Sequence, residues 1–430
     1  MRRDALGFLT EIARRYGDVA RFRIGPTTLH ILSRPEWIRD LLVTHADRFH
    51  KGRGLERAKR VLGQGLLTSE DPVHLRQRRM MQSAFHRERI AGYASVMAEY
   101  AARHAESWRD GDTRDMSREM SRLTMAIVGK TLLDADVASD SDEIGRALTD
   151  TIESFGRTIS LQFFPILDRL PFPSNRRFDR ARERIDSTIA RLIAERRESP
   201  KGRRDLLTML VAAQDVEGDG TGMSDSQVRD ETVTIFLAGH ETTANALAWT
   251  WYLLSQNREV ETRFHRELDA FPENAVFDFG DLSALRYTEM VLAESMRLYP
   301  PAWILGRRAL VDYEVGGYVI PKGSIVAACQ WVTHRDPRFF PEPERFDPER
   351  FRAEVRETRP KFSYFPFGGG PRVCIGESFA WMEGVLLLAT LARRWRMRLT
   401  PGQTVVPLPS ITLRPKHGMR MVLEKRPERL

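Results

Sequence analysis

The sequence predicts a mainly α-helical protein with small β-sheets, an α+β fold in which one long central helix crosses the domain. Helix-like periodicity dominates from Val73 to Asn257, whereas strand-like alternation is confined to short segments outside this region. Those segments do not alternate with helices, so a parallel sheet of the α/β type is not expected. The 430 residues also lack a Gly/Ser/Pro-rich linker and an internal repeat, which predicts a single domain over residues 1–430.

The first elements are a helix and a hairpin. A helical pattern covers Ala5–Tyr16, and two alternating stretches, Val19–Ile24 and Thr28–Leu32, surround the Gly25-Pro26 turn. This arrangement is typical of a β-hairpin. Because the first helix begins almost at Met1, we expect that a leading segment has been trimmed.

Two loops interrupt the helical region. The basic stretch Lys51–Gly65 contains glycines and predicts a mobile loop. In Phe163–Ser174, aromatic and aliphatic residues alternate with three prolines between two charged helices. We expect these two loops to cover a pocket.

The best-marked helix begins at Ser224. The separation of Ser224 and Gln227 fits a capping box, and Met223 and Val228 are placed as a hydrophobic staple. Apolar residues then continue to about Leu254, so we expect the middle of this helix to be buried.

The C-terminal part combines strands with one apolar helix. Strand patterns return at Tyr313–Thr333 and in the region Val405–Met421. A helix-like apolar run covers Phe379–Trp395. These segments predict small sheets and a further buried helix.

Composition and charge limit the class of protein. Hydrophobic residues make up 42% and charged residues 29% of the chain, as in globular proteins with a substantial core. The net charge of +8 is dispersed and lacks interleaved aromatic residues, so nucleic-acid binding is not expected. No apolar run reaches the roughly 18 residues of a transmembrane helix, and no signal-peptide pattern is present. We expect a cytoplasmic monomer.

The chain has only two cysteines, and they differ in their surroundings. Cys329 lies in an apolar, strand-like run, Ile325–Val332, where burial explains it. Cys374 lies in a bend, Phe367–Gly376, whose four glycines permit unusual backbone angles and leave space for a flat group. Amides at the start of the following helix would stabilise a thiolate. Cys374 is therefore a candidate metal ligand, and the alternative is a small buried hydrophobe beside a turn.

The stretch Phe-Gly-x-Gly-x-Arg-x-Cys-x-Gly resembles the haem-binding loop of the cytochromes P450 at every fixed position. The resemblance implies the cytochrome P450 fold, with the long helix over the haem. It implies that Cys374 is the axial ligand of iron in haem b, iron protoporphyrin IX. It also implies that Phe367 packs near the sulfur, that Arg372 faces a haem propionate, and that Gly376 belongs to the cofactor-binding loop.

Polar residues occur in the middle of the long predicted helix, at Ala238-Gly239-His240-Glu241-Thr242-Thr243. A buried, unpaired carboxylate is costly, and a glycine lets a ligand approach the backbone. The alternative is that local contacts satisfy Glu241 and the threonines. The segment resembles the family's oxygen-activation motif, small-Gly-x-acid-Thr. This implies that Glu241 and Thr242 deliver protons to bound oxygen and that Gly239 makes room for it.

Glu294 and Arg297 are three residues apart on a predicted helix, so they share a face and can pair. Pro343-Glu344-Arg345-Phe346 follows about fifty residues later. This order resembles the family's structural Glu-Arg-Arg triad. The resemblance implies that Glu294, Arg297 and Arg345 hold the core behind the haem and assist cofactor incorporation.

The haem propionates need cations or other donors at the edge of an apolar slot. His74 and Arg78 are four residues apart and resemble the family's His-x-x-x-Arg propionate pair. Arg307 also resembles a propionate position, where adjacent Arg308 is the alternative. For His74 and Arg78 the alternative is an ordinary charged surface.

The substrate pocket is less marked. The resemblance assigns pocket-wall positions to Phe236, Ala302, Trp303, Ile304 and Leu305, and to Leu55–Leu67, Phe155–Phe164 and Pro409–Ile411. Each is also a plausible core segment. The apolar side chains favour an apolar substrate such as a terpenoid or a fatty acid, and Pro300–Leu305 weakly resembles members that act on long terpenoids.

The resemblance implies a monooxygenase that inserts one atom of dioxygen into an apolar substrate. No flavin, nicotinamide or iron–sulfur motif is visible, so we expect electrons from a separate ferredoxin and its reductase. Clustered arginines favour an acidic partner face, with solvated helix faces as the alternative: Arg76, Arg78, Arg79, Arg393, Arg394, Arg396 and Arg398. The rival functions are a peroxide-driven hydroxylase and a non-catalytic haem sensor or carrier.

Overall fold

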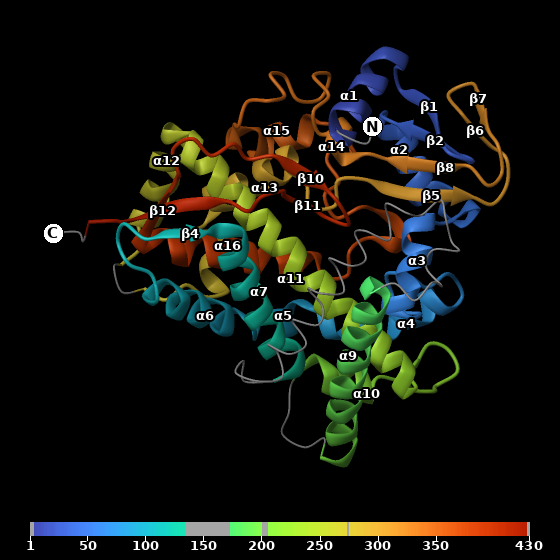
Figure 1. Cartoon of the computed structure of the whole chain (residues 1–430), viewed down its shortest axis with the longest axis horizontal. Helices are drawn as coiled ribbons and strands as arrows, with labels where there is room; N and C mark the ends of the chain where they lie inside the picture. Colours follow the sequence, from blue (N-terminus) through green and yellow to red (C-terminus); the bar gives the residue numbers. More distant parts are fainter. Residues whose placement is uncertain (1–3, 135–172, 200–204, 273–274, 428–430) are drawn as a thin grey trace. The chain divides into compact units, whose positions relative to one another are not determined.

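The computed structural model describes residues 4–134, 173–199, 205–272 and 275–427 (Figure 1). The predicted pocket segment Phe155–Phe164, and the predicted loop Phe163–Ser174 up to residue 172, lie outside the described residues. The chain divides into two compact units, each assembled from segments distant in sequence. The first comprises Met1–Phe49, Ala91–Leu123 and Glu241–Leu430, and the second comprises His50–Ile90 and Thr124–His240. The single domain expected from the sequence stays a prediction.

The first unit contains most of the strands. Its helices are α1 (Ala5–Tyr16), α2 (Pro35–Arg39), α6 (Ala94–Glu106), α12 (Arg258–Asp269), α13 (Arg286–Leu298), α14 (Gln330–Thr333), α15 (Ala353–Thr358) and α16 (Glu377–Arg394). Its short turns are the π-helical η1 (Asp40–Thr44) and the 3-10 turns η2 (Ala46–Arg48), η5 (Gly280–Ser283), η6 (Pro348–Phe351) and η7 (Gly370–Arg372). Its strands are β1 (Val19–Ile24), β2 (Thr27–Leu32), β4 (Thr113–Asp115), β5 (Leu305–Ala309), β6 (Tyr313–Val315), β7 (Tyr318–Ile320), β8 (Ile325–Ala328), β9 (Trp395–Leu399), β10 (Pro407–Pro409), β11 (Leu413–Pro415) and β12 (Arg420–Lys425).

The second unit is helical within the described residues. It contains α3 (Arg53–Leu62), α4 (Val73–Gln82), η3 (Ser83–Phe85), α9 (Pro173–Glu198) and α10 (Leu206–Ala212). Four elements have residues in both units: β3 (Phe49–Lys51), α5 (Arg87–Ala91), α7 (Met116–Leu133) and α11 (Asp225–Gln256).

The largest sheet confirms the predicted N-terminal hairpin. Its strand order is β1-β2-β8-β5-β3, and β1 pairs antiparallel with β2, with Ala20 opposite Ile31. Strand β8 then pairs parallel to β2 and antiparallel to β5. The last strand pattern is also confirmed, because β12 lies between β4 and β9 in a second sheet. Figure 1 shows β12 beside β4.

Two sequence predictions need correction. The strand pattern at Tyr313–Thr333 ends in a helix, α14, because β8 stops at Ala328. The mobile loop predicted at Lys51–Gly65 is wrong, since α3 occupies most of it. Its residues Ala58, Val61 and Leu62 are buried, and the basic residues between them obscure this helical periodicity in the sequence.

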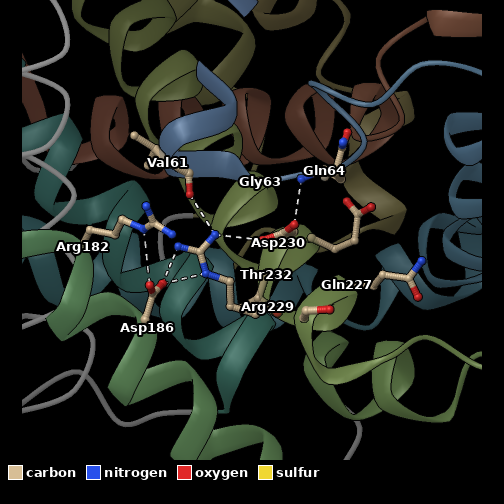
Figure 2. A network of polar contacts seen from close by, with 12 residues as sticks. Val61, Gly63, Gln64, Arg182, Asp186, Gln227, Arg229, Asp230 and Thr232 are labelled. Carbon is tan, nitrogen blue, oxygen red and sulfur yellow. Dashed lines mark hydrogen bonds and ion pairs between the residues drawn. The ribbon is translucent and has the colours of Figure 1, made fainter. Parts of the chain in front are cut away.

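A polar network in the second unit explains why residues 61–66 are well anchored. Figure 2 shows Arg229 on α11 donating to the Val61 carbonyl (2.8 Å) and to the Asp186 carboxylate (2.7 Å). Asp230 accepts from the Gln64 backbone amide at 2.7 Å (Figure 2). Two residues of this chain segment, Val61 and Gln64, are thus held by charged groups from elsewhere in the unit, which disfavours mobility.

Helix α11 begins as its capping signals predict. The Ser224 amide donates to the Gln227 side chain at 2.9 Å, and the Gln227 amide donates to the Ser224 hydroxyl at 3.3 Å. Met223 and Val228 are both buried, as a hydrophobic staple requires. Helix α16 likewise matches its predicted apolar run, and Trp395 already begins β9. Within the described residues, no helix combines the length and the apolar character of a bilayer-spanning segment.

Candidate active site

The Cys374 loop is shaped by glycines with left-handed backbone angles. Gly368 and Gly370 have φ values of 76° and 69°, a region that other residues rarely adopt. Two backbone hydrogen bonds close the bend, from the Gly368 amide to the Phe365 carbonyl and from the Cys374 amide to the Phe367 carbonyl, both at 3.0 Å. The loop leaves Cys374 exposed, whereas Cys329 is buried.

Two of these glycines make room for the chain itself. A Cβ atom on Gly370 would lie 2.0 Å from the carbonyl oxygen of Leu42 in η1. A Cβ atom on Gly369 would lie 2.4 Å from the ring of Phe362. From the sequence, these glycines are expected to leave space for a flat group. In the structure, packing within the first unit already requires them.

Helix α16 begins three residues after Cys374. Gly376 is its N-cap and offers no side-chain cap, so amides of the first turn are available to an anionic group. Phe367 lies with its ring centroid 5.7 Å from that of Trp381, one turn into α16. This contact fixes Phe367 against the helix, and its predicted packing near the sulfur stays a prediction.

Buried histidine His334 anchors the start of the loop. Its Nε2 accepts a hydrogen bond from the Phe365 amide at 3.0 Å. Burial lowers the pKa of His334 well below its ordinary value, and the nearby Arg297 guanidinium acts in the same direction. A neutral imidazole can accept at Nε2, as this bond requires. Arg297 also donates to the His334 carbonyl at 2.8 Å, so the loop is tied to α13.

Glu294 and Arg297 pair as predicted. Both are fully buried, and two hydrogen bonds of 2.6 and 2.8 Å join the guanidinium to the carboxylate. The Asp347 amide donates to the same carboxylate at 2.9 Å. Burial raises the pKa of the Glu294 carboxyl, while Arg297 acts in the opposite direction.

The prediction that Arg345 is the third member of this triad needs correction. Its side chain is 63% exposed and pairs with Glu342 at 3.2 Å, and only its backbone carbonyl reaches Arg297. The side chain of Arg350 lies beside Glu294 instead, at 3.5 Å, and is largely buried. The signal is visible in the sequence, because Pro-Glu-Arg-Phe occurs twice, at 343–346 and at 348–351, and the second copy supplies the arginine.

Glu241 is held by a residue that sequence reasoning misses. The Thr412 hydroxyl lies 2.7 Å from Glu241 Oε1, and the Asn245 amide nitrogen lies 3.2 Å from Thr412 Oγ1. Thr412 is far from Glu241 in sequence and carries no pattern of its own. Asn245 could have been found, since it is one helical turn after Glu241 on a predicted helix. Thr242 follows Glu241 on α11 and is half-buried.

Ala238 and Gly239 are the residues with the smallest side chains in the polar part of α11, and both belong to the second unit. Ala238 is exposed although most of the neighbouring helix is buried. A Cβ atom on Gly239 would lie 3.2 Å from a methyl group of Val128 on α7, which is tighter than ordinary contact. His240 is structural, because its ring Nδ1 lies 2.9 Å from the Phe236 carbonyl.

A buried carboxyl lies next to the polar part of α11. Glu383 on α16 is fully buried, and neither of its oxygens has a well-formed hydrogen bond within the described residues. Burial raises the pKa of Glu383 to about 8. The hydroxyl of Thr243 is near enough to act in the opposite direction, but its geometry is too poor for a hydrogen bond. The sequence gives no signal for Glu383 beyond an acid in an apolar helix.

The predicted propionate residues occupy different units. His74 and Arg78 lie one turn apart on α4 in the second unit, and the His74 ring is buried with Nδ1 3.3 Å from Asp71. Arg307 is buried on β5 in the first unit, and Arg372 is half-buried in η7. Their roles toward propionates stay predictions.

The predicted pocket residues also stay predictions. Phe236 is buried on α11, with its ring centroid 5.8 Å from that of His240. Trp303 and Ile304 pack against a core cluster that contains Leu9 and Ile31. The remaining two, Ala302 and Leu305, are half-buried.

Several of the clustered arginines bind groups of this chain. Arg79 pairs with buried Asp215 at 2.8 Å, and Arg76 donates to the Thr221 hydroxyl at 2.6 Å. Arg398 pairs with Glu261 at 2.7 Å. These contacts favour a structural role for the three arginines over an acidic partner face.

The comparisons with known proteins all indicate the same family. Residues 2–421 match the model of the cytochrome P450 family. The chain is 39% identical over 428 residues to cyclooctatin synthase of Streptomyces melanosporofaciens, covering 99% of this chain and 92% of that protein. It is 37% identical over 407 residues to cyclooctat-9-en-7-ol 5-monooxygenase of the same organism, covering 94% and 87%. The crystal structure of the cytochrome P450DA haem domain superposes with a TM-score of 0.89 at 27% identity, covering 98% and 93%.

The residues present fit the haem b that this family binds. A thiol is exposed in a rigid glycine bend, amides of the first turn of α16 follow it, and α11 carries an acid and a hydroxyl side by side. A cysteine sulfur next to a helix N-terminus suits an anionic axial ligand. The family match over nearly the whole chain and the two bacterial relatives show that this protein belongs to the cytochrome P450 family and is a haem-dependent monooxygenase.

Proposed function

We propose that Cys374 is the thiolate ligand of the haem iron and that this monooxygenase oxidises an apolar terpenoid-like substrate. The observation that carries the first part is the loop itself. Its bend is fixed by hydrogen bonds at Phe365 and Phe367, so the exposed sulfur is presented by a rigid backbone. When bound, the haem supplies dioxygen activation and redox chemistry, whereas the protein supplies the ligand, the proton path and a dry pocket.

The start of α16 stabilises negative charge on the sulfur. Unpaired amides and the helix dipole favour an anion at this end of a helix. Glu377 in the first turn of α16 would oppose this effect if ionised, but burial raises the pKa of its carboxyl.

We assign proton handling to Glu241 and Thr242. The Thr412 hydroxyl fixes one oxygen of Glu241, at 2.7 Å. Thr242 is the next residue on α11, and its hydroxyl can both accept and donate a proton. An acid that is anchored at one oxygen can pass a proton at the other without leaving its place.

The substrate class rests on the relatives and on the pocket prediction. One relative is named for the oxidation of cyclooctat-9-en-7-ol, an alcohol with a carbon–carbon double bond. The predicted pocket positions Phe236, Trp303 and Ile304 are apolar, which suits a hydrocarbon skeleton. We propose a ring-containing terpenoid with few oxygen atoms. We also propose that a ferredoxin and its reductase deliver the electrons.

The ligand assignment is tested with the reduced, carbon-monoxide-bound absorption spectrum. Wild-type protein with full haem is expected to show the thiolate signature, and Cys374→Ser is expected to lose it. Cys329→Ser is the matched control, because this cysteine is buried beside β8 and is expected to leave the spectrum unchanged. A thiolate signature that persists in Cys374→Ser would overturn the assignment.

The proton role is tested by coupling, the ratio of product formed to dioxygen consumed. Thr242→Ala is expected to lower this ratio under ferredoxin-driven turnover, and Thr242→Ser is expected to restore it. Unchanged coupling in Thr242→Ala would contradict the role of the hydroxyl. The screen for substrate uses the haem spin-state shift with cyclic terpenoids and, for comparison, linear fatty acids of similar size.

A further inference from the structure

A short hairpin in the first unit connects two segments that the proposed function treats separately. Strands β10 and β11 pair antiparallel and are joined by residues 410–412. On one side, the Trp303 indole donates to the Ser410 carbonyl at 3.0 Å, and the Leu413 amide donates to the Pro301 carbonyl at 2.9 Å. The hairpin is therefore bonded to the segment in which the predicted pocket residues lie.

On its other side the hairpin is bonded to α11. Glu241, Asn245 and Trp249 are spaced four residues apart and therefore lie along one face of the helix. The Trp249 indole donates to the Leu413 carbonyl at 3.0 Å, and the two polar residues both contact the Thr412 hydroxyl. One helical face thus holds the hairpin through three successive turns.

The direction of these bonds is determined by their chemistry. The Asn245 amide nitrogen can only donate, so Thr412 Oγ1 must be the acceptor in that contact. The single hydroxyl hydrogen of Thr412 is then directed to Glu241 Oε1. Thr412 is buried, so competition from solvent is weak and the orientation is retained.

We propose that Thr412 is a positioning residue that holds the carboxylate of Glu241 and makes its placement depend on the segment around Trp303, which is predicted to line the pocket. This inference rests on the proposed proton role of Glu241. Substrate that displaces the 301–303 segment would move the hairpin through the two bonds to Ser410 and Leu413. The same displacement would loosen Glu241, so only a well-fitting substrate keeps the acid in place.

The test compares Thr412→Val, which keeps the shape and removes the hydroxyl, with Thr412→Ser, which keeps the hydroxyl. Thr412→Val is expected to lower product per dioxygen on the order of tenfold, the scale of losing one hydrogen bond to a charged group. The dissociation constant for substrate, from the spin-state shift, is expected to change less than about twofold. Thr412→Ser is expected to retain wild-type coupling. Thr404→Val, at an exposed threonine, is the matched control.

A second readout does not depend on turnover. The infrared carboxylate band that disappears in Glu241→Gln belongs to Glu241. This band is expected to shift in Thr412→Val and to stay in place in Thr412→Ser, because only the valine variant removes the hydrogen bond. A band that stays in place in Thr412→Val would overturn the inference.

The double variant Thr412→Val/Glu241→Gln distinguishes a failure of the positioning role of Thr412 from a failure of the proposed proton role of Glu241. If Thr412 acts through Glu241, the double variant is expected to couple no worse than Glu241→Gln alone. If the losses of coupling in the two single variants add up in the double variant, the positioning role of Thr412 is overturned and the role of Glu241 stays intact. Unchanged coupling in Glu241→Gln alone would overturn the proposed proton role and, with it, this inference.

Discussion

Replacing Glu383 by Gln is expected to remove a pH-dependent loss of stability. The Glu383 carboxyl is fully buried on α16, and burial raises its pKa from 4.5 to about 8. Below pH 4.5 the group is protonated in both the folded and the unfolded state. Between pH 4.5 and about 8 the unfolded chain releases the proton and the folded protein keeps it, so the free energy of unfolding falls as the pH rises.

The size of this effect follows from the interval between the two pKa values. Each pH unit within it changes the free energy of unfolding by about 1.4 kcal/mol, so the interval of about 3.5 units corresponds to about 5 kcal/mol. Between pH 6 and pH 8 the loss is about 3 kcal/mol. For 430 residues the unfolding entropy is about 0.9 kcal/mol/K, which makes this loss about 3 °C in Tm.

The assay is thermal unfolding of haem-loaded protein, followed by circular dichroism at pH 6, 7, 8 and 9. The Tm of wild type is expected to fall by about 3 °C relative to Glu383→Gln over this range. Glu354→Gln, at an exposed glutamate on α15, is expected to follow wild type. Burial also raises the pKa of Glu231 to about 8, and this contribution is common to all three proteins. Parallel Tm curves for wild type and Glu383→Gln would refute the reasoning.

Two further predictions concern the cysteine loop and its support. Gly370→Ala is expected to lower the haem-to-protein ratio, since its Cβ atom would lie 2.0 Å from the Leu42 carbonyl oxygen. Gly402 has a similar φ of 78° but open space around it, so Gly402→Ala introduces backbone strain without a clash. A full haem complement in Gly402→Ala would show that the loss in Gly370→Ala comes from the clash. Arg350→Met is expected to destabilise the protein by about 3 kcal/mol, measured by urea unfolding, because it removes one of the two cations beside the buried Glu294 carboxylate and leaves only Arg297. Arg345→Met is expected to cost less than about 0.5 kcal/mol, and equal losses would restore Arg345 to the triad.

The sequence predicts features that depend on local pattern and misses those that depend on partners. The capping box at Ser224 and the Glu294–Arg297 pair are local, so their spacing alone predicts both contacts. Helix α3 is missed because basic residues separate its buried positions. Thr412 is missed because its bond to Glu241 spans 171 residues and depends on where the β10–β11 hairpin folds.

The two halves of the proposed site are held in different chemical ways, and this difference has a consequence for related enzymes. In the cysteine loop the groups that are held belong to the backbone: the Phe365 amide donates to the His334 side chain, and Gly370 abuts the Leu42 carbonyl. Backbone groups are present whatever the residue, so substitutions at positions 42 and 365 need not disturb the loop. Glu241 is held by the side-chain hydroxyl of Thr412, and any residue without a donor there loses the bond. We therefore expect differences in coupling between related monooxygenases to arise more from the hairpin than from the cysteine loop.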